Sequence, residues 1–138
     1  MATAAIPATA FAELRELYAR LSEELEPYRR HCDARGICCN FKAHGHRLYV
    51  TALEAAEMAN AGVPADRALA ESGSCPFLNG KLCGVREHRA LGCRMYFCDT
   101  TYDEQRNALY EKFLSAIRAI ETKHGIEATY TQVIEVKF

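Results

Sequence analysis

The sequence predicts an α+β fold that is mostly α, with two long amphipathic helices packed around a cysteine-rich loop and hairpin core. Apolar residues recur at helical spacing near both ends of the 138-residue chain. All seven cysteines lie between Cys32 and Cys98, in a stretch that has turn and hairpin signals instead of long helical periodicity. A chain of this length is expected to form a single domain, residues 1–138, that buries a core without disulfide bonds.

The first long helix is expected over residues 9–31, where apolar residues recur every three to four positions with acidic residues between them. Pro27 is expected to kink this helix or to end it early, because proline lacks the amide hydrogen that a helix interior needs. Residues 33–45 contain glycine, asparagine and other polar residues without periodicity, which is typical of a loop. The acidic residues of both long helices are expected on solvated faces.

The middle of the chain predicts shorter elements. A short strand is expected at residues 48–50. The sequence of residues 51–54 is a capping box, which predicts a helix that runs to about Ala61 and is ended by Gly62. Another short helix is expected over residues 64–73, because it begins with a proline and ends with Ser-Gly.

A hairpin is expected next, because Asn79-Gly80 between short apolar runs is typical of a type I′ turn. This hairpin is expected to hold Cys75 and Cys83 at the open ends of two paired strands.

The chain then predicts one helical turn at residues 86–90 and a second long amphipathic helix at residues 103–124. Gly125 follows this helix as its expected C-terminal cap, and the loosely alternating residues 129–138 are expected to form a strand.

The seven thiols admit three interpretations: a disulfide framework, a metal or iron-sulfur centre, and a set of unrelated buried cysteines. A disulfide framework is disfavoured because the N-terminus does not resemble a signal peptide and an odd number of cysteines would leave one unpaired. No apolar run approaches the roughly 18–20 residues that a membrane span needs. We therefore expect a cytoplasmic protein with no membrane partner, and the net charge of -1 gives no reason to expect nucleic acid.

The charge pattern favours a thiolate site. Residues 29–98 contain ten lysines and arginines against six acidic residues, whereas the two flanks are acidic. Positive charge near a cysteine favours the thiolate over the thiol. Solvated or phosphate-contacting arginines are the alternative interpretation of the same pattern.

Clustered sulfur donors favour soft or borderline ions, namely zinc, copper(I) or iron, including iron-sulfur clusters. Seven thiols exceed the four that one zinc ion or one four-iron cluster uses. The surplus suggests a polynuclear centre, an exchangeable site or a redox pair. Histidines near the cysteines are further candidate ligands, with His46 preferred over His44, His31 and His88.

The order and spacing of these residues resemble the YkgJ-type cysteine-cluster family of zinc- or iron-chelating domains. That pattern is CxxCxxCC, then CPxL, then C-x-(V/I), then R-(P)-x-x-C-R-x-(Y/F)-x-C. It is matched over residues 31–98 by His31-Cys32-Asp-Ala-Arg35-Gly-Ile-Cys38-Cys39, Cys75-Pro-Phe-Leu, Cys83-Gly-Val85 and Arg89 with Cys93-Arg94-Met-Tyr96-Phe-Cys98. The chain departs from the pattern at Arg35, where a second cysteine is usual, and at Ala90, where proline is usual.

The resemblance implies a metal-chelating domain with residues 31–98 as its core motif. We predict a metal-binding protein that holds an iron or iron-sulfur centre; redox activity, as in iron-sulfur oxidoreductases, is a further expectation. The alternatives are a zinc-binding structural or interaction module and a metal-handling chaperone. The expected metal ligands are Cys32, Cys38, Cys39, Cys75, Cys83, Cys93 and Cys98, with Arg35, Arg89 and Arg94 offsetting their negative charge at the cofactor.

The sequence assigns no catalytic residues. It has no serine-histidine-acid pattern, phosphate-binding glycine loop or dinucleotide fingerprint, so any catalysis would depend on the metal centre. The expected partner is the metal ion, and the sequence does not specify a redox or protein partner.

Overall fold

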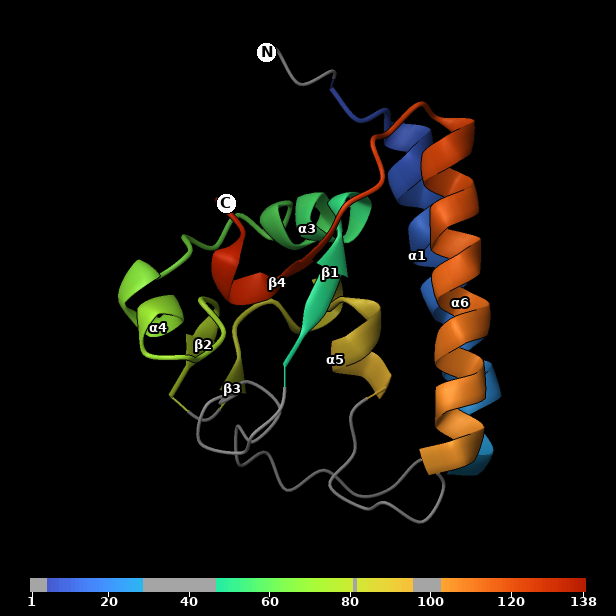
Figure 1. Ribbon diagram of the computed structural model, residues 1–138, viewed down its shortest axis with the longest axis horizontal. Helices are drawn as coiled ribbons and strands as arrows, with labels where there is room; N and C mark the ends of the chain where they lie inside the picture. The colour runs from blue at the N-terminus through green and yellow to red at the C-terminus, as the bar shows by residue number, and fades with distance from the viewer. Residues whose placement is uncertain (1–4, 29–46, 81, 96–102) are drawn as a thin grey trace.

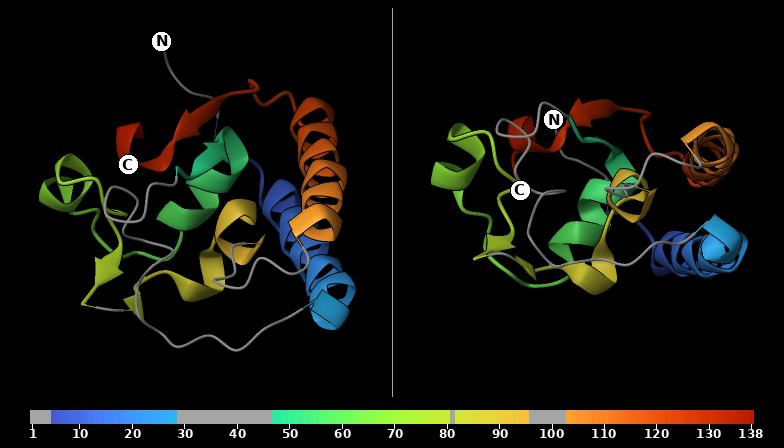
Figure 2. Two further views of the ribbon diagram at one scale, coloured as in Figure 1. Left: turned by 60° about the horizontal axis from the view of Figure 1, so that its bottom comes forward. Right: turned by 90° about the horizontal axis from the view of Figure 1, so that it is seen from below.

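The computed structural model describes residues 5–28, 47–80, 82–95 and 103–138 (Figure 1). The predicted fold class is confirmed: the described residues are mostly helical, with two small antiparallel strand pairs. The long helices α1 (Ala8–Leu25) and α6 (Asp103–Lys123) lie side by side along one side of the molecule, and the shorter elements form the other side (Figures 1 and 2). None of the helices in these ranges is long and apolar enough to cross a membrane.

Helix α1 ends where Pro27 was expected to interrupt it. The chain passes into a 3-10 turn, Glu26–Tyr28, and the last residues of the predicted helix lie outside the described ranges. The apolar stripe of α1 packs against α6, so that Leu14 and Leu21 are fully buried near Ile117. Burying each such side chain contributes about 1.5–3 kcal/mol.

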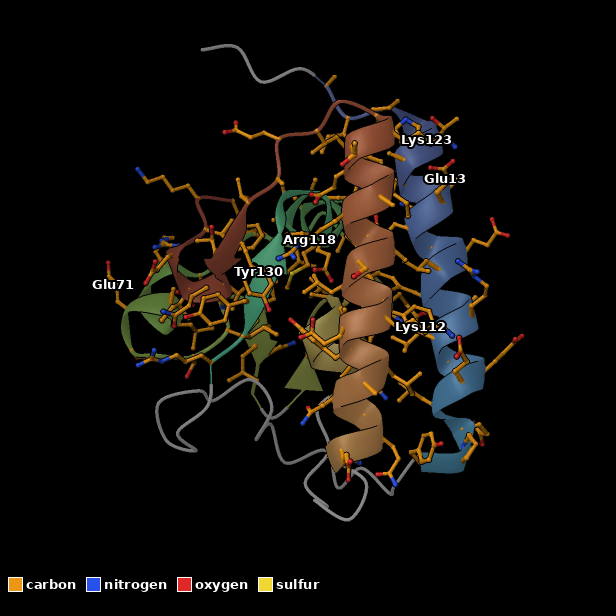
Figure 3. The ribbon with its side chains drawn as sticks, turned by 45° about the vertical axis from the view of Figure 1, so that its right-hand side comes forward. Glu13, Glu71, Lys112, Arg118, Lys123 and Tyr130 are labelled. Atoms are coloured by element: carbon orange, nitrogen blue, oxygen red, sulfur yellow. The ribbon has the colours of Figure 1, made fainter. Side chains whose placement is uncertain are left out.

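Ion pairs along the edges of the two helices show that they run antiparallel (Figure 3). Lys112 pairs with Glu24 at 2.6 Å, whereas Lys123 pairs with Glu13 near the other end of α1. His124 Nε2 lies 2.8 Å from the same Glu13 carboxylate. The two lysines are largely exposed, so packing and not charge accounts for most of the stability of this helical hairpin.

Strand β1 (Tyr49–Thr51) leads directly into helix α3 (Ala52–Ala59), and the predicted capping box is present. The Thr51 hydroxyl accepts the backbone N–H of Glu54 at 3.3 Å, and the Glu54 carboxylate accepts the backbone N–H of Thr51 at 3.2 Å. Gly62 follows the helix with φ +72°, a left-handed conformation that favours glycine and stops the helix.

Helix α4 (Arg67–Glu71) begins at Arg67 and not at Pro64 as the sequence analysis expected. The Asp66 carboxylate accepts the backbone N–H groups of Ala68 and Leu69, so an aspartate N-cap sets the start of the helix. Ser72 closes it, as expected.

The predicted hairpin is formed by β2 (Leu78–Asn79) and β3 (Leu82–Cys83), with Gly80 in its turn at φ +64°. Its register pairs Leu78 with Cys83. The expectation that Cys75 and Cys83 lie at the ends of paired strands is therefore correct only for Cys83. Cys75 lies in a preceding turn, where its carbonyl accepts the backbone N–H of Leu78 at 3.0 Å.

After the 3-10 turn Arg86–His88, the chain forms a short helix that the sequence analysis did not predict, α5 (Leu91–Met95). The last predicted strand is shorter than expected. Strand β4 (Tyr130–Gln132) pairs antiparallel with β1 and is followed by the 3-10 turn Val133–Glu135.

Candidate metal centre and the buried carboxylates beside it

Three of the seven cysteines lie in the described part of the chain, at Cys75, Cys83 and Cys93. So do Arg89, Arg94 and the histidine candidate His88. The remaining predicted site residues lie outside it: Cys32, Cys38, Cys39, Cys98 and Arg35, together with the histidine candidates His31, His44 and His46.

The three described cysteines come together in one apolar cluster. Cys75 is 2% exposed, and the half-buried Cys83 and Cys93 pack against the same cluster. They reach it from a turn, a strand and a helix that are separated along the chain. The other buried members of the cluster are Leu48, Val50, Met58, Phe77, Val85, Ala90 and Val133.

Within residues 5–28, 47–80, 82–95 and 103–138, no group of three or more histidine, cysteine, aspartate or glutamate residues is placed to hold a metal ion. Cys75, Cys83 and Cys93 therefore share a cluster without being placed as joint ligands of one ion, and a complete ligand set would have to include residues from the remaining segments.

Helix α5 lies between the two hydrophobic cores of the molecule. Its residues Leu91 and Met95 are buried against the helical hairpin of α1 and α6. Cys93, about 200° around the helix from Leu91, packs instead against the cysteine cluster. The orientation of α5 about its own axis thus decides where the Cys93 thiol is presented.

Arg94, next to Cys93, is held by backbone carbonyls and by an aromatic ring. Its guanidinium donates to the carbonyls of Arg89 at 2.8 Å and of Glu87 at 3.2 Å, and lies 4.0 Å from the ring centroid of Tyr18. Partial burial lowers the pKa of Arg94, and the neighbouring Arg89 adds to this effect. A fixed guanidinium at this position favours a negative charge on the adjacent thiol.

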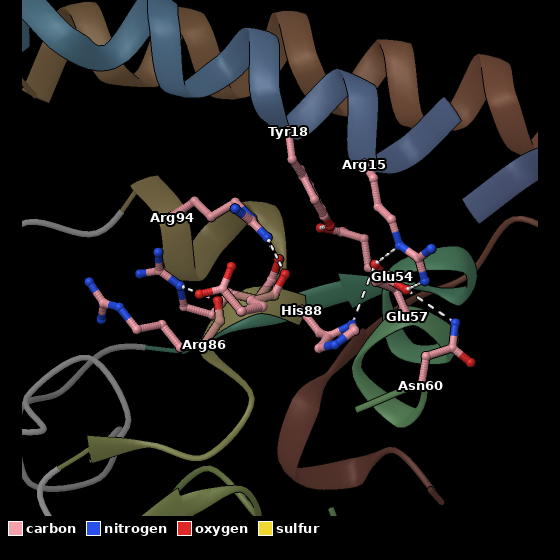
Figure 4. Close-up of polar contacts among 10 residues, drawn as sticks. Arg15, Tyr18, Glu54, Glu57, Asn60, Arg86, His88 and Arg94 are labelled. Carbon is pink, nitrogen blue, oxygen red and sulfur yellow. Dashed lines mark hydrogen bonds and ion pairs between the residues drawn. The ribbon is translucent and has the colours of Figure 1, made fainter. Parts of the chain in front are cut away.

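Glu54 is a fully buried carboxylate that joins three parts of the fold (Figure 4). Its Oε2 accepts the Tyr18 hydroxyl of α1 at 2.9 Å and the backbone N–H of Leu91 at the start of α5. Its Oε1 accepts the N–H and the hydroxyl of Thr51, each at 3.2 Å. Burial raises the pKa of Glu54, and these donated hydrogen bonds oppose that rise.

Glu57, one turn further along α3, is equally buried but has different partners (Figure 4). Arg15 donates to both of its oxygens, at 2.7 and 2.9 Å, and Asn60 donates at 3.1 Å. The hydrogen bonds from Arg15 and Asn60 lower the pKa of Glu57 against the opposing effect of burial. His88 Nδ1 lies 3.5 Å from this carboxylate, so the structure directs the His88 ring toward Glu57.

Glu121 is a third buried carboxylate and corrects the expectation that acidic residues of the long helices are solvated, since its side chain is 1% exposed. Its Oε2 accepts the backbone N–H of Leu53 at 3.0 Å, at the start of α3. Its Oε1 has no hydrogen-bond partner among the described residues. Burial raises the pKa of Glu121, and the nearby Glu54 carboxylate raises it further.

The sequence contained a signal for only one of these carboxylates. The capping box identified Glu54 as a local helix cap but gave no sign of its bonds to Tyr18 and Leu91. Those bonds join residues 36 and 37 positions apart. Glu121 lies on an amphipathic helix that carries several acidic residues. No local feature of the sequence distinguishes Glu121, which is buried, from the acidic residues that are exposed to solvent.

Comparison of the chain with protein-family models, with curated proteins and with solved structures finds no match.

Proposed function

We propose that this protein holds an iron or iron-sulfur centre through clustered cysteine thiolates. The observation that most supports the proposal is that Cys75, Cys83 and Cys93 all belong to one largely buried cluster. The resemblance of residues 31–98 to a metal-chelating family points to the same chemistry.

The side chains of the described cysteines and arginines are of the chemical types that a centre of soft or borderline metal ions needs. Thiolates prefer iron and zinc over magnesium or calcium, and their negative charge requires compensation when it is buried. Arg94, held beside Cys93, and Arg89 supply positive charge at this place. In the proposal, Cys32, Cys38, Cys39 and Cys98 complete the ligand set, with Arg35 near them. A bound iron-sulfur centre would supply one-electron redox chemistry.

Elemental analysis of protein purified without oxygen is the main test. We expect iron with acid-labile sulfide and an absorption band at about 400 nm. A colourless protein with stoichiometric zinc would replace the iron centre by the zinc alternative, and chelator titration should then unfold the chain as zinc leaves. A preparation without any metal, before and after anaerobic reconstitution, would refute the proposal.

A pair of variants within the cysteine cluster separates metal binding from packing. Cys75→Ser removes a sulfur, whereas Val85→Ala removes apolar volume from the same cluster, where Val85 is 2% exposed. We expect Cys75→Ser to lose bound metal. Val85→Ala should keep the metal although it destabilises the fold by about 2 kcal/mol. Equal metal content in the two variants would show that Cys75 is not a ligand.

A further inference from the structure

The orientation of Cys93 depends on a helix that is too short to be stable by itself. Helix α5 has five residues, and an isolated helix of this length is not stable in water. Its position must therefore come from tertiary contacts. Leu91 and Met95 contribute apolar burial on one face, which turns this face of α5 toward α1 and α6 but supplies no directional bond to the helix.

Directional contacts to α5 come from Glu54 and Tyr18. The Glu54 carboxylate accepts the N–H of Leu91 at the first residue of the helix. The Tyr18 hydroxyl donates to the same oxygen, and the Tyr18 ring lies under the guanidinium of Arg94 near the other end of the helix. Glu54 itself is held at its second oxygen by Thr51. Figure 4 shows Tyr18 reaching from α1 toward Glu54 on α3.

We propose that Glu54 is a positioning residue for the Cys93 thiol: it holds α5 against α1 and α3 and so keeps Cys93 in the cysteine cluster without binding metal itself. The effect of Glu54 on metal binding rests on the function proposed above. The effect of Glu54 on the position of Cys93 concerns the metal-free protein and can be tested separately.

Glutamine is the informative replacement at Glu54 because both carboxylate oxygens accept hydrogen bonds, Oε1 from Thr51 and Oε2 from Tyr18 and Leu91. A carboxylate accepts on both oxygens, whereas an amide offers one oxygen and one NH₂ group. In Glu54→Gln the NH₂ group must therefore face either the Thr51 donors or the pair formed by Tyr18 and Leu91. Glu57→Gln is the matched control, because Glu57 is on the same helix and just as buried, and its hydrogen bonds come from Arg15 and Asn60 and not from α5.

The test is alkylation of the reduced, metal-free protein by N-ethylmaleimide, with the rate at each cysteine followed by peptide mass spectrometry. We expect Glu54→Gln to raise the rate at Cys93 about tenfold, with Cys75 and Cys83 unchanged, because the loss of buried hydrogen bonds favours local opening of α5. Glu57→Gln should label like the wild type. Tyr18→Phe, which removes one of the donors to Glu54, should raise the Cys93 rate by a smaller factor.

The outcomes separate the two proposals. An unchanged Cys93 rate in Glu54→Gln, or an equal rise at all three cysteines, would overturn the positioning role whether or not the protein binds metal. If the wild type binds iron or zinc, the chelator EDTA should remove that metal about tenfold faster from Glu54→Gln than from Glu57→Gln. Equal rates of removal would overturn the link between Glu54 and metal retention. A wild type that binds no metal, with Cys93 selectively exposed in Glu54→Gln, would refute the proposed function and leave the positioning role supported.

Discussion

Replacing Glu121 by glutamine is expected to stabilise this protein at neutral pH. The Glu121 side chain is 1% exposed, and its Oε1 lacks a hydrogen-bond partner among the described residues. Glutamine keeps an oxygen that can accept the N–H of Leu53 and removes a buried negative charge near Glu54. Most substitutions of buried residues destabilise a protein, so an increase in stability would be a distinctive result.

The magnitude follows from the buried charge. The amide of glutamine leaves a polar group at the place of the unpaired oxygen, so only the additional penalty for burying a charged group is removed. We expect a net gain of about 1 kcal/mol at pH 8. The pKa of Glu121 is raised in the folded protein, so its favourable contribution is fully present below the unfolded pKa of about 4.5 and is lost as the pH rises through the folded pKa. The advantage of glutamine should therefore grow as the pH rises from below about 4.5 through the folded pKa, and stay level above it.

Urea unfolding at several pH values from about 4 to 8 measures this effect through the free energy of unfolding. Glu111→Gln is the control, because Glu111 is exposed on the same helix and its replacement should change stability by less than about 0.5 kcal/mol. If Glu121→Gln is less stable than the wild type at pH 8, or if the stability difference does not change with pH, the assignment of an ionised, poorly compensated Glu121 is wrong.

Three further substitutions test a close packing contact, a helix cap and an exposed ion pair. Gly92→Ala should destabilise the fold by about 1–3 kcal/mol, because an added Cβ would lie 2.4 Å from Leu48 Cδ1; a melting temperature equal to that of the wild type would contradict this contact. Thr51→Ala should cost about 1 kcal/mol in urea unfolding through loss of the capping box, and Thr51→Ser should recover most of it. Lys112→Ala should change the free energy of unfolding by less than about 0.5 kcal/mol, because its pair with Glu24 is exposed; a larger loss would show that this pair does stabilise the helical hairpin.

The sequence by itself determined the elements that depend on local pattern. The long helices follow from apolar spacing, the end of α1 follows from Pro27, and the start of α3 follows from the capping box at Thr51. In each case the deciding interactions join residues that are close in sequence, within about one helical turn, or residues that repeat along one apolar face of the same helix. The hairpin was predicted for the same reason, although its register was not.

Only the tertiary structure decided how α5 forms and which acidic residues are buried. The five residues of α5 have no strong helical signal, and their conformation depends on Leu91 and Met95 packing against α1 and α6. Glu54 and Glu121 are buried because donors from distant parts of the chain meet their oxygens. Hydrogen bonds over such sequence separations depend on the folded arrangement of whole elements, and no local pattern of residues encodes them.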